Sequence, residues 1–303
     1  MIVRWGLEEL PGVLGDVGVE RPLLVAGPRW DELSIPAAAR WSEIPSDRIS
    51  VPAGVDGILA VGGGSAIDTA KAASAASALP LVSVPTTYSG AEWTDFFGVR
   101  TPDRLQVGGG GGARPAGIVY DPELTLGLSR PVSAGTAMNA LAHCVEALYP
   151  GDLDEARRGA AGIDRWLLRV LEDGADLEAR TGLLEAASDA GRSLARRGLY
   201  LAHAMAQAVG GAYGLPHGAM NAICLPPAMR FNAPVVPDAM TAVPVERVEE
   251  LARLGGFERL RDFGVPEADL DELGARAASR PGAQANPRPV SAAEAVQLLR
   301  SVW

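Results

Sequence analysis

The N-terminal part of the chain alternates short apolar runs with turns that are rich in Gly and Pro. Four such runs are RPLLVAG, VDGILAVGGGS, LPLVSVPTT and AGIVYDPEL. Apolar runs of this length, flanked by turn residues and with a helical stretch between the second and the third, are typical of buried parallel strands in an α/β layer. The pattern therefore predicts a parallel sheet in this part of the chain.

After residue 129 the pattern changes to long segments rich in Ala, Leu and Arg, with apolar positions at helical spacing. These segments predict helices over residues 136–148, 155–172, 176–209, 218–230 and 245–262. The change divides the chain into an α/β domain, residues 1–129, and an all-helical domain, residues 130–303. The cleft between two such domains is a natural place for a ligand. The run GGGGG at 108–112 is expected to form a flexible loop.

Composition narrows the class of protein. The 303-residue chain has a formal charge of -10, which disfavours nucleic acid as a partner because phosphate backbones are repelled. It holds no apolar run long enough to cross a bilayer and no secretory signal pattern at its N-terminus. Its two cysteines are too few for a disulfide framework. We therefore expect a cytoplasmic protein that acts on a small molecule, with no membrane partner.

A glycine-rich turn, in ILAVGGGSAIDTAK, joins a predicted strand directly to a predicted helix through Gly62, Gly63, Gly64 and Ser65. Three glycines let the backbone approach a bulky anion, and the free N–H groups at the start of a helix favour phosphate. The turn is thus a candidate phosphate cradle. Its spacing is not GxGxxG, so a tight turn without a ligand is the alternative.

Polar residues surround this turn in the sequence. Asp68 and Lys71 lie three residues apart on one face of the following helix, as a solvated ion pair or in a functional or packing role. Lys71 is the only lysine of the chain, which favours the second interpretation. Thr86, Thr87 and Ser89 follow the next strand, at the edge of an open sheet where ligands bind.

The chain contains three histidines, His143, His203 and His217. Asn139 lies four residues before His143 and Gln207 four residues after His203, so each pair shares a helix face. A single histidine is more often a hydrogen-bonded core residue than a ligand. Three imidazoles and an amide oxygen, however, can surround a divalent cation. We expect the three histidines to meet in one site.

Several motifs occur in a fixed order from about residue 56 to the C-terminus, among them GGGSAIDTAK, VPTTYSGAEWT, YDPELTLGLS, TAMNALAHCVEALY, HAMAQAVGGAYGLPHGAMNAICLP and NPRPVSAAEAVQLLRSVW. They resemble the iron-containing alcohol dehydrogenase superfamily, in particular its maleylacetate reductase branch. The resemblance implies a dehydroquinate synthase-like fold, in which a nucleotide-binding α/β domain precedes an all-helical domain and the active site lies in the cleft. Helical domains of this kind offer dimer surfaces, so a homodimer is expected.

The resemblance also implies a cofactor, NAD(H) or NADP(H). The residues at the family's cofactor positions are Gly62, Gly63, Gly64, Ser65, Asp68, Thr86, Thr87 and Ser89. The turn would hold the pyrophosphate, and the hydroxyl residues would approach the nicotinamide.

At the family's metal position, His143, His203 and His217 match the histidine ligands, but Asn139 replaces an aspartate of the metal-dependent dehydrogenases. A site without that charge would hold Fe2+ or Zn2+ more weakly, and the maleylacetate reductase branch is usually described as working without a metal. Both alternatives stay open. Gln207 stands where the family often has a histidine that relays protons, and an amide cannot titrate.

The leading hypothesis is a nicotinamide-dependent reductase of a small oxo or enone acid, in which the histidines stabilise negative charge on the substrate oxygen. The region before the glycine-rich turn is too short for two full crossover helices. This shortening, together with Asn139 and Gln207, motivates the alternative of a non-redox lyase, isomerase or cyclase. A catalytically silent subunit is a third possibility. Arginine is suited to clamp a substrate carboxylate, and the candidates are Arg100, Arg104, Arg114 and Arg230.

Overall fold

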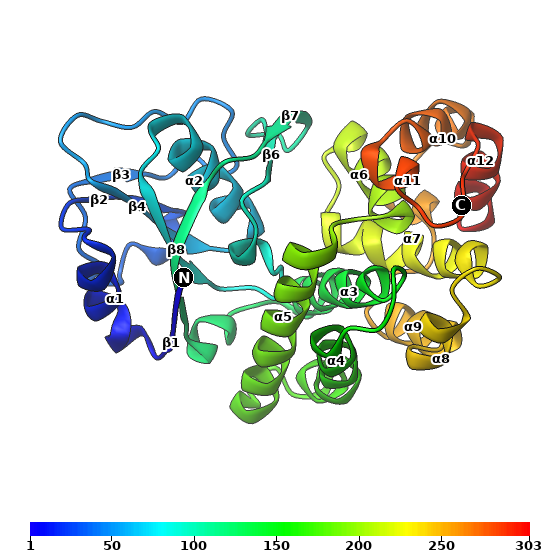
Figure 1. Cartoon of the computed structure of the whole chain (residues 1–303), viewed down its shortest axis with the longest axis horizontal. Coiled ribbons are helices and arrows are strands. Elements are labelled where there is room, and N and C mark those ends of the chain that lie inside the picture. Colours follow the sequence, from blue (N-terminus) through cyan, green and yellow to red (C-terminus); the bar gives the residue numbers. More distant parts are fainter. The chain divides into compact units, whose positions relative to one another are not determined.

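The computed structural model describes all residues from 1 to 303 and divides them into two compact units. The α/β unit spans Met1–Gly127 and the helical unit spans Leu128–Trp303. Figure 1 labels their helices and strands. In the sequence, the change of pattern lies at residue 129. Each unit is described by itself.

The α/β unit is built on a six-stranded sheet in which all neighbouring strands are parallel. Its strands are β1 (Ile2–Trp5), β2 (Pro22–Ala26), β3 (Ala39–Trp41), β4 (Gly57–Gly62), β5 (Pro80–Pro85) and β8 (Arg114–Tyr120). Their order across the sheet is β1-β8-β5-β4-β2-β3. The predicted parallel sheet and the predicted fold class are confirmed.

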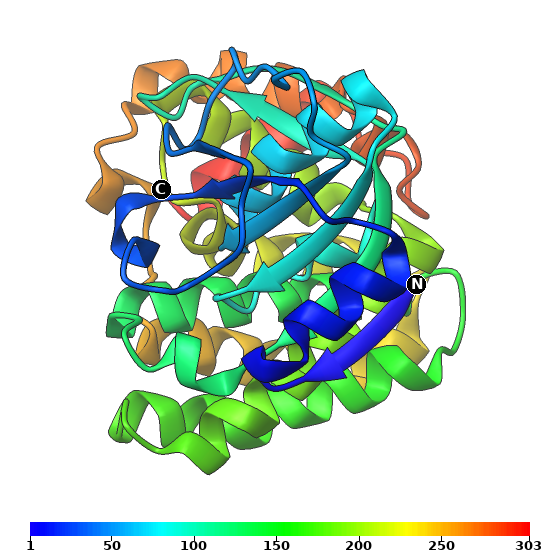
Figure 2. The same cartoon turned by 90° about the vertical axis from the view of Figure 1, so that its left-hand side faces the viewer.

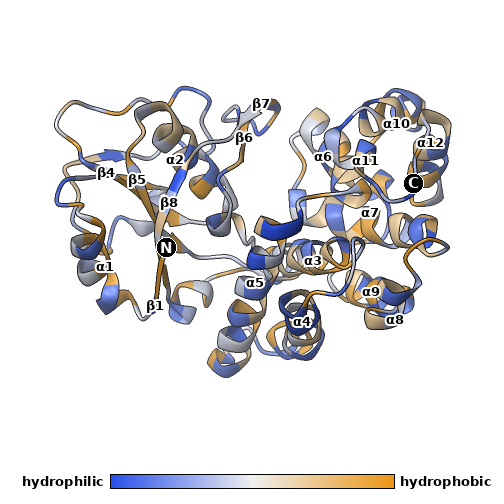
Figure 3. Ribbon diagram, viewed as in Figure 1, coloured by the Kyte–Doolittle hydropathy of each residue, from blue (hydrophilic) through white to orange (hydrophobic).

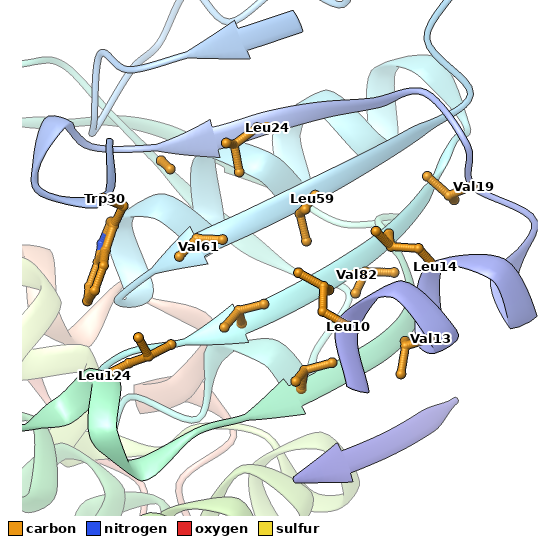
Figure 4. Packing of buried hydrophobic residues seen from close by; sticks show 13 residues of the cluster. Leu10, Val13, Leu14, Val19, Leu24, Trp30, Leu59, Val61, Val82 and Leu124 are labelled. Atoms are coloured by element: carbon orange, nitrogen blue, oxygen red, sulfur yellow. The ribbon is translucent and has the colours of Figure 1, made fainter. Parts of the chain in front are cut away.

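Successive residues of the central strands pack on opposite faces of this sheet, as the pleat requires. On one face, Leu59 of β4 and Val82 of β5 belong to a buried cluster with residues of α1 (Leu10–Val17), shown in Figure 4. On the other face, Ile58 of β4 packs in a cluster with residues of α2 (Gly64–Ser77). Figure 2 shows α1 lying next to β1 on its side of the sheet. Burial on both faces is why these strands read as continuous apolar runs.

The two connections between β2 and β4 contain no α-helix. One 3-10 turn, Pro28–Trp30, lies between β2 and β3, and residues 42–56 join β3 to β4 without a helix. The sequence predicts this shortening, since too few residues precede the glycine-rich turn for two crossover helices.

A hairpin of β6 (Phe97–Arg100) and β7 (Gln106–Gly110) forms a second, antiparallel sheet. The expectation of a flexible loop over residues 108–112 is therefore wrong for the part that belongs to β7. A Cβ at Gly110 would lie 2.9 Å from the ring of Phe97. The absence of a side chain is what lets β7 lie against this ring, so the glycines serve close strand pairing.

The helical unit contains α3 to α12. Their bounds are α3 (Arg130–Ala147), α4 (Asp154–Glu172), α5 (Leu177–Arg197), α6 (Leu201–Tyr213), α7 (His217–Asn232), α8 (Pro237–Ala242), α9 (Val245–Leu254), α10 (Leu270–Ala278), α11 (Pro281–Gln284) and α12 (Ala292–Ser301). Blue and orange segments alternate along α4 in Figure 3, as expected of an amphipathic helix with one buried face. In contrast, α3 and α7 are buried over most of their lengths, so they form the centre of the unit.

Two predicted helices end earlier than their apolar patterns suggest. The helix predicted over 176–209 is two helices. Gly198 adopts a φ of 76°, which ends α5 before α6 begins. The helix predicted over 245–262 ends at Leu254, where Gly255 and Gly256 follow. No helix of the chain combines the length and apolar composition needed to cross a membrane.

Candidate functional site

The three histidines meet inside the helical unit. His143 comes from α3, His203 from α6, and His217 is the first residue of α7. The ring centroids of His143 and His203 are 4.8 Å apart with their planes 12° from parallel, and those of His203 and His217 are 5.7 Å apart. The structure thus brings together the residues that the sequence singled out.

A contact of two glycines places His217 in this cluster. Gly218, the second residue of α7, lies against Gly135 of α3, and a Cβ at Gly218 would lie 2.2 Å from the carbonyl oxygen of Gly135. Only glycine allows the two backbones to approach so closely. Gly218 therefore positions the side chain of His217, the residue before it in the chain.

Glu146 lies three residues after His143 on α3, and its carboxylate is fully buried. Oε2 accepts hydrogen bonds from Nδ1 of His203 at 2.7 Å and from the N–H of Tyr200 at 2.9 Å. Oε1 accepts from the N–H groups of Ala202 at 2.8 Å and His203 at 3.3 Å. N–H groups at the start of a helix have no partner within it. Glu146 therefore caps α6 and orients His203 with the same two oxygens.

This contact fixes the tautomer of His203. A carboxylate only accepts hydrogen bonds, so Nδ1 of His203 carries a proton, and Nε2 of the neutral ring carries the lone pair. Nε2 is buried and has no hydrogen-bond partner. The negative charge of Glu146 also compensates the positive charge that the ring carries when it is protonated. His203 can accordingly accept and return a proton at Nε2.

Asn221 orients His217, as Glu146 orients His203. His217 lies four residues before Asn221 on α7. The Nδ2 amino group of Asn221 donates to Oδ1 of Asn139 at 2.7 Å and lies 3.0 Å from Nε2 of His217. Since an amino group only donates, Nε2 of His217 is the acceptor, and the neutral ring carries its proton on Nδ1. Asn139 and His217 are thus held by one amide, whose Oδ1 is buried without a partner.

His143 completes the cluster as a neutral ring. It is buried, and its Nδ1 has no hydrogen-bond partner. Burial lowers the pKa of His143 well below its usual value, and the neighbouring imidazoles His203 and His217 lower it further. His143 therefore acts as an uncharged hydrogen-bonding group at neutral pH.

Gln207 lies one helical turn after His203 on α6 and is half-buried. Its Oε1 accepts a hydrogen bond from Arg280 at 3.1 Å. The amide is therefore held in place by a guanidinium, and it cannot exchange a proton with His203.

In the α/β unit, the glycine-rich turn follows β4 and starts α2. A Cβ at Gly63 would lie 2.8 Å from Cγ2 of Thr87, and one at Gly64 would lie 3.3 Å from Cβ and Oγ of Ser89. The turn and the end of β5 thus touch because the turn has no side chains. Oγ1 of Thr87 is buried without a hydrogen-bond partner beside the turn. Together with the N–H groups of the first turn of α2, it fits a bound anion.

Of the other predicted cofactor residues, Thr86 and Asp68 form hydrogen bonds with the backbone. The N–H of Thr86 donates to the carbonyl of Gly62 at 3.0 Å, and Ser65 lies in the first turn of α2. Asp68 accepts the N–H of Gly98, at the start of the hairpin, at 3.2 Å. Its partially exposed side chain leaves the carboxylate open to a ligand as well.

Lys71 is fully buried, so the interpretation as a solvated ion pair is wrong. Its Nζ donates to Oγ1 of Thr94 at 2.7 Å and to the carbonyl of Phe96 at 3.0 Å, and lies 3.8 Å from Oδ1 of Asp68. Burial lowers the pKa of Lys71. The single lysine ties the segment before the hairpin to α2, which is a packing role.

Known proteins match this chain over nearly its whole length. A profile of iron-containing alcohol dehydrogenases matches residues 49–122, and the profile of the C-terminal part of the Fe-containing alcohol dehydrogenase family matches residues 133–303. Maleylacetate reductase from Pseudomonas sp. (strain P51) is 31% identical over 329 residues, which cover 98% of this chain and 93% of the relative. The chain belongs to the iron-containing alcohol dehydrogenase family.

Solved structures of this family share the fold. A putative alcohol dehydrogenase from Ralstonia eutropha JMP134 superposes with a TM-score of 0.89 at 29% identity, covering 100% of this chain and 95% of that one. Maleylacetate reductase from Rhizobium sp. strain MTP-10005 superposes with a TM-score of 0.85 at 27% identity, with the same coverage. The protein is an oxidoreductase with a likeness to maleylacetate reductases.

Although iron names the family, the histidine cluster does not fit a metal ion. An imidazole binds a metal along a lone pair in the plane of its ring, and the rings of His143 and His203 are stacked on one another, 4.8 Å apart. Nε2 of His217 and Oδ1 of Asn139 already face the amino group of Asn221. No group of three or more His, Cys, Asp or Glu side chains is placed to hold a metal. The chemistry of the cluster is therefore that of its side chains.

Two residues of the candidate site, Glu146 and Asn221, were not predicted from the sequence. The signal was present, since Glu146 follows His143 by three positions and Asn221 follows His217 by four. Both spacings put a polar residue on the histidine's face of a helix. The same rule had selected Asn139 and Gln207.

Proposed function

We propose that the protein is a nicotinamide-dependent reductase of maleylacetate or of a closely similar oxo or enone acid. The observation that carries this proposal is the buried pair of Glu146 and His203, in which Nε2 of His203 has no hydrogen-bond partner. The pair occurs in a chain that is 31% identical to a maleylacetate reductase. A second such relative, from Pseudomonas knackmussii, is 34% identical over 262 residues, covering 82% of this chain and 74% of the relative.

The cofactor, NAD(H) or NADP(H), would be held by the glycine-rich turn, Gly62 to Ser65. Asp68 and the hydroxyl groups of Thr86, Thr87 and Ser89 would complete its site. The fit rests on the unpartnered Oγ1 of Thr87 and on the close contact of Gly63 with Thr87. When bound, the nicotinamide supplies a hydride.

Maleylacetate is a dicarboxylate with a ketone conjugated to a C=C bond. Hydride addition to the alkene carbon β to the ketone moves the electron pair of the C=C bond onto the ketone oxygen, which becomes an enolate. Protonated His203 would donate a hydrogen bond from Nε2 to this oxygen, while Glu146 compensates the charge of the ring. Protonation of the α carbon then completes the reduction, with one hydride and one proton consumed.

Orientation of the neighbouring groups favours the same step. Asn221 holds His217 with its proton on Nδ1, so this ring also offers a donor. His143 stays neutral because burial lowers its pKa. Donors that are fixed before the reaction stabilise a developing oxyanion without reorganisation.

No observation favours the alternative of a non-redox lyase, isomerase or cyclase. The shortened connections between β2 and β4 leave the glycine-rich turn and the end of β5 intact, so the reason for that alternative does not extend to the cofactor residues. A homodimer and a cytoplasmic location are further proposals, which light scattering of the purified chain and cell fractionation test.

The direct test is an assay of the purified chain with maleylacetate and NADH or NADPH, followed by the loss of reduced nicotinamide. We expect one equivalent of cofactor to be oxidised for each substrate consumed, with the same rate after treatment with a chelator. Turnover that needs no nicotinamide would favour the non-redox alternative. No turnover with either cofactor would overturn the proposed function.

A further inference from the structure

The end of a neighbouring strand lies beside the glycine-rich turn. β2 and β4 are parallel, and Ala26, the last residue of β2, pairs with Val61 of β4. Gly27 therefore stands next to Gly62, where the turn begins, at a strand spacing of about 5 Å. In dinucleotide-binding sheets, an acidic residue near the pyrophosphate turn accepts a hydrogen bond from the 2′-hydroxyl of the adenine ribose, whereas an arginine accommodates the 2′-phosphate of NADP(H). The residues that follow β2 are thus the place to seek a group that chooses the cofactor.

No acidic residue ends β2 itself, because a glycine and a proline follow it directly. Where a crossover helix is missing, the chain makes the 3-10 turn Pro28–Trp30. The ring of Trp30 is buried in the hydrophobic cluster on the α1 face of the sheet, and the N–H of Asp31 donates to the carbonyl of Pro28 at 3.0 Å. Asp31 is therefore the first carboxylate after β2, and its backbone is held on an anchored turn.

Arg40 of β3 fixes the position of this carboxylate. Its Nη2 donates to the carbonyls of Ala26 at 3.4 Å and Gly27 at 3.2 Å. The same nitrogen lies 2.5 Å from Oδ1 of Asp31. One guanidinium therefore joins Asp31 to the end of β2, one strand away from the glycine-rich turn. The side chain of Asp31 is 61% exposed and that of Arg40 is 32% exposed, so a bound ligand can reach both.

This charged pair can distinguish the two nicotinamide cofactors, which differ only in the 2′ group of the adenine ribose. The carboxylate of Asp31 accepts a hydrogen bond from the 2′-hydroxyl of NADH, since a carboxylate only accepts. The 2′-phosphate of NADPH in the same place brings a second negative group against the carboxylate, and like charges in contact are unfavourable. Arg40 favours a phosphate, but its charge is already paired with Asp31.

We propose that Asp31, held by Arg40, makes the protein bind NADH in preference to NADPH. The inference rests on the proposed nicotinamide-dependent function and names the residues that choose its cofactor. The preference comes from a carboxylate that opposes the competing ligand. Without the charge of Asp31, Arg40 would remain at the end of β2 without an anionic partner, and the same place would then favour a 2′-phosphate.

The test measures dissociation constants and needs no turnover. The fluorescence of NADH and NADPH is titrated in the wild type, in Asp31→Asn and in the double variant Asp31→Asn/Arg40→Gln. Calorimetry with AMP and with adenosine 2′,5′-bisphosphate repeats the comparison on the adenosine half alone. Two control variants are matched in charge. Asp16→Asn changes an exposed residue of α1, and Arg29→Gln changes the other arginine of the turn, which lies over the ring of Trp30, 4.4 Å from its centroid.

We expect the wild type to bind NADPH about tenfold to a hundredfold more weakly than NADH, because the 2′-phosphate meets the carboxylate. D31N should reduce this ratio by about tenfold or more, since the phosphate then pairs with Arg40. The double variant should lose most of the affinity for NADPH that D31N gains. The ratio in the wild type should also decrease as salt is added, because exposed charges are screened. Both control variants should keep the wild-type ratio within about twofold.

Equal affinities of the wild type for NADH and NADPH, tighter binding of NADPH, or a ratio that D31N leaves unchanged would overturn the role of Asp31 and leave the proposed function standing. A change in either control variant as large as that in D31N would also contradict this role. Binding of neither dinucleotide would overturn the proposed function and this inference together. If the double variant does not fold, as judged by circular dichroism, D31N decides alone, because asparagine replaces an exposed aspartate of the same shape.

Discussion

Each unit of the molecule buries a glutamate, and the surroundings of the two differ. Glu146 of the helical unit accepts four hydrogen bonds, three of them from backbone N–H groups. Glu92 of the α/β unit, 2% exposed, accepts one from the hydroxyl of Tyr120 at 2.6 Å, and its Oε2 has no hydrogen-bond partner. Burial raises the pKa of Glu92.

The two sites differ in which residue carries the atom without a hydrogen-bond partner. Both oxygens of Glu146 accept hydrogen bonds, and the atom without a partner is Nε2 of His203. At Glu92 the open atom belongs to the carboxyl itself, which favours the uncharged acid. The carboxylate of Glu146 orients a ring, whereas the carboxyl of Glu92 beside Tyr120 is a packed polar group. Variants of both sites can break this comparison.

The largest effect is expected for Glu146→Ala. The change removes four hydrogen bonds, so we expect a loss of about 3–5 kcal/mol in the free energy of unfolding. Maleylacetate reduction should fall by about 10²- to 10⁴-fold, because His203 loses its orientation. Denaturant unfolding and steady-state kinetics measure the two effects. The control Glu178→Ala removes an exposed partner of Arg169 and should cost about 0–1 kcal/mol. Equal losses in both variants would contradict the special role of Glu146.

An intermediate effect is expected for Asn221→Ala. Oδ1 of Asn139 and Nε2 of His217 lose their shared donor, at a cost of about 1–3 kcal/mol in unfolding free energy. The tautomer of His217 also loses its support, so kcat should decrease. Urea unfolding and kinetics check these expectations. A variant as stable and active as the wild type would show that the amide does not position the ring.

The smallest effect is expected for Glu92→Gln, which keeps the shape of a protonated carboxyl. Because the pKa of Glu92 is higher in the folded chain than the ordinary 4.5, its stabilising effect is fully present below that value and is lost as pH rises through the folded pKa. Stability of E92Q relative to the wild type should thus increase with pH, starting from a difference below about 1 kcal/mol in acid. Urea midpoints measured over a pH series check this, and a constant difference would contradict a raised pKa of Glu92.

Much of this architecture could be predicted from local pattern. The central strands are apolar runs because both faces are buried, and the histidines meet because each lies on the inward face of a helix. The hairpin was missed, since a glycine run reads as a flexible loop until Phe97 is known to pack against Gly110. The break of 176–209 at Gly198 was missed because apolar spacing continues across it.

The site could be predicted only in part. Helix spacing brought Asn139, His143 and Gln207 into view, but the partners that set their chemistry come from long-range contacts. Arg280 is 73 residues from Gln207, and no local pattern connects them. A metal site was a reasonable inference from residue types, yet the orientation of the rings decides ligation, and orientation depends on Glu146 and Asn221.

The most direct test of the central claim is the tautomer of His203. With only three histidines, the protein labelled with ¹⁵N-histidine gives a two-bond ¹H–¹⁵N spectrum that single His→Gln variants assign. We predict that neutral His203 carries its proton on Nδ1. We also predict that its Nε2 signal shifts when adipate, a dicarboxylate that cannot be reduced, is added. A ring of His203 protonated only on Nε2, or an Nε2 signal that is indifferent to the acid, would contradict a proton donor held by Glu146 and aimed at the substrate.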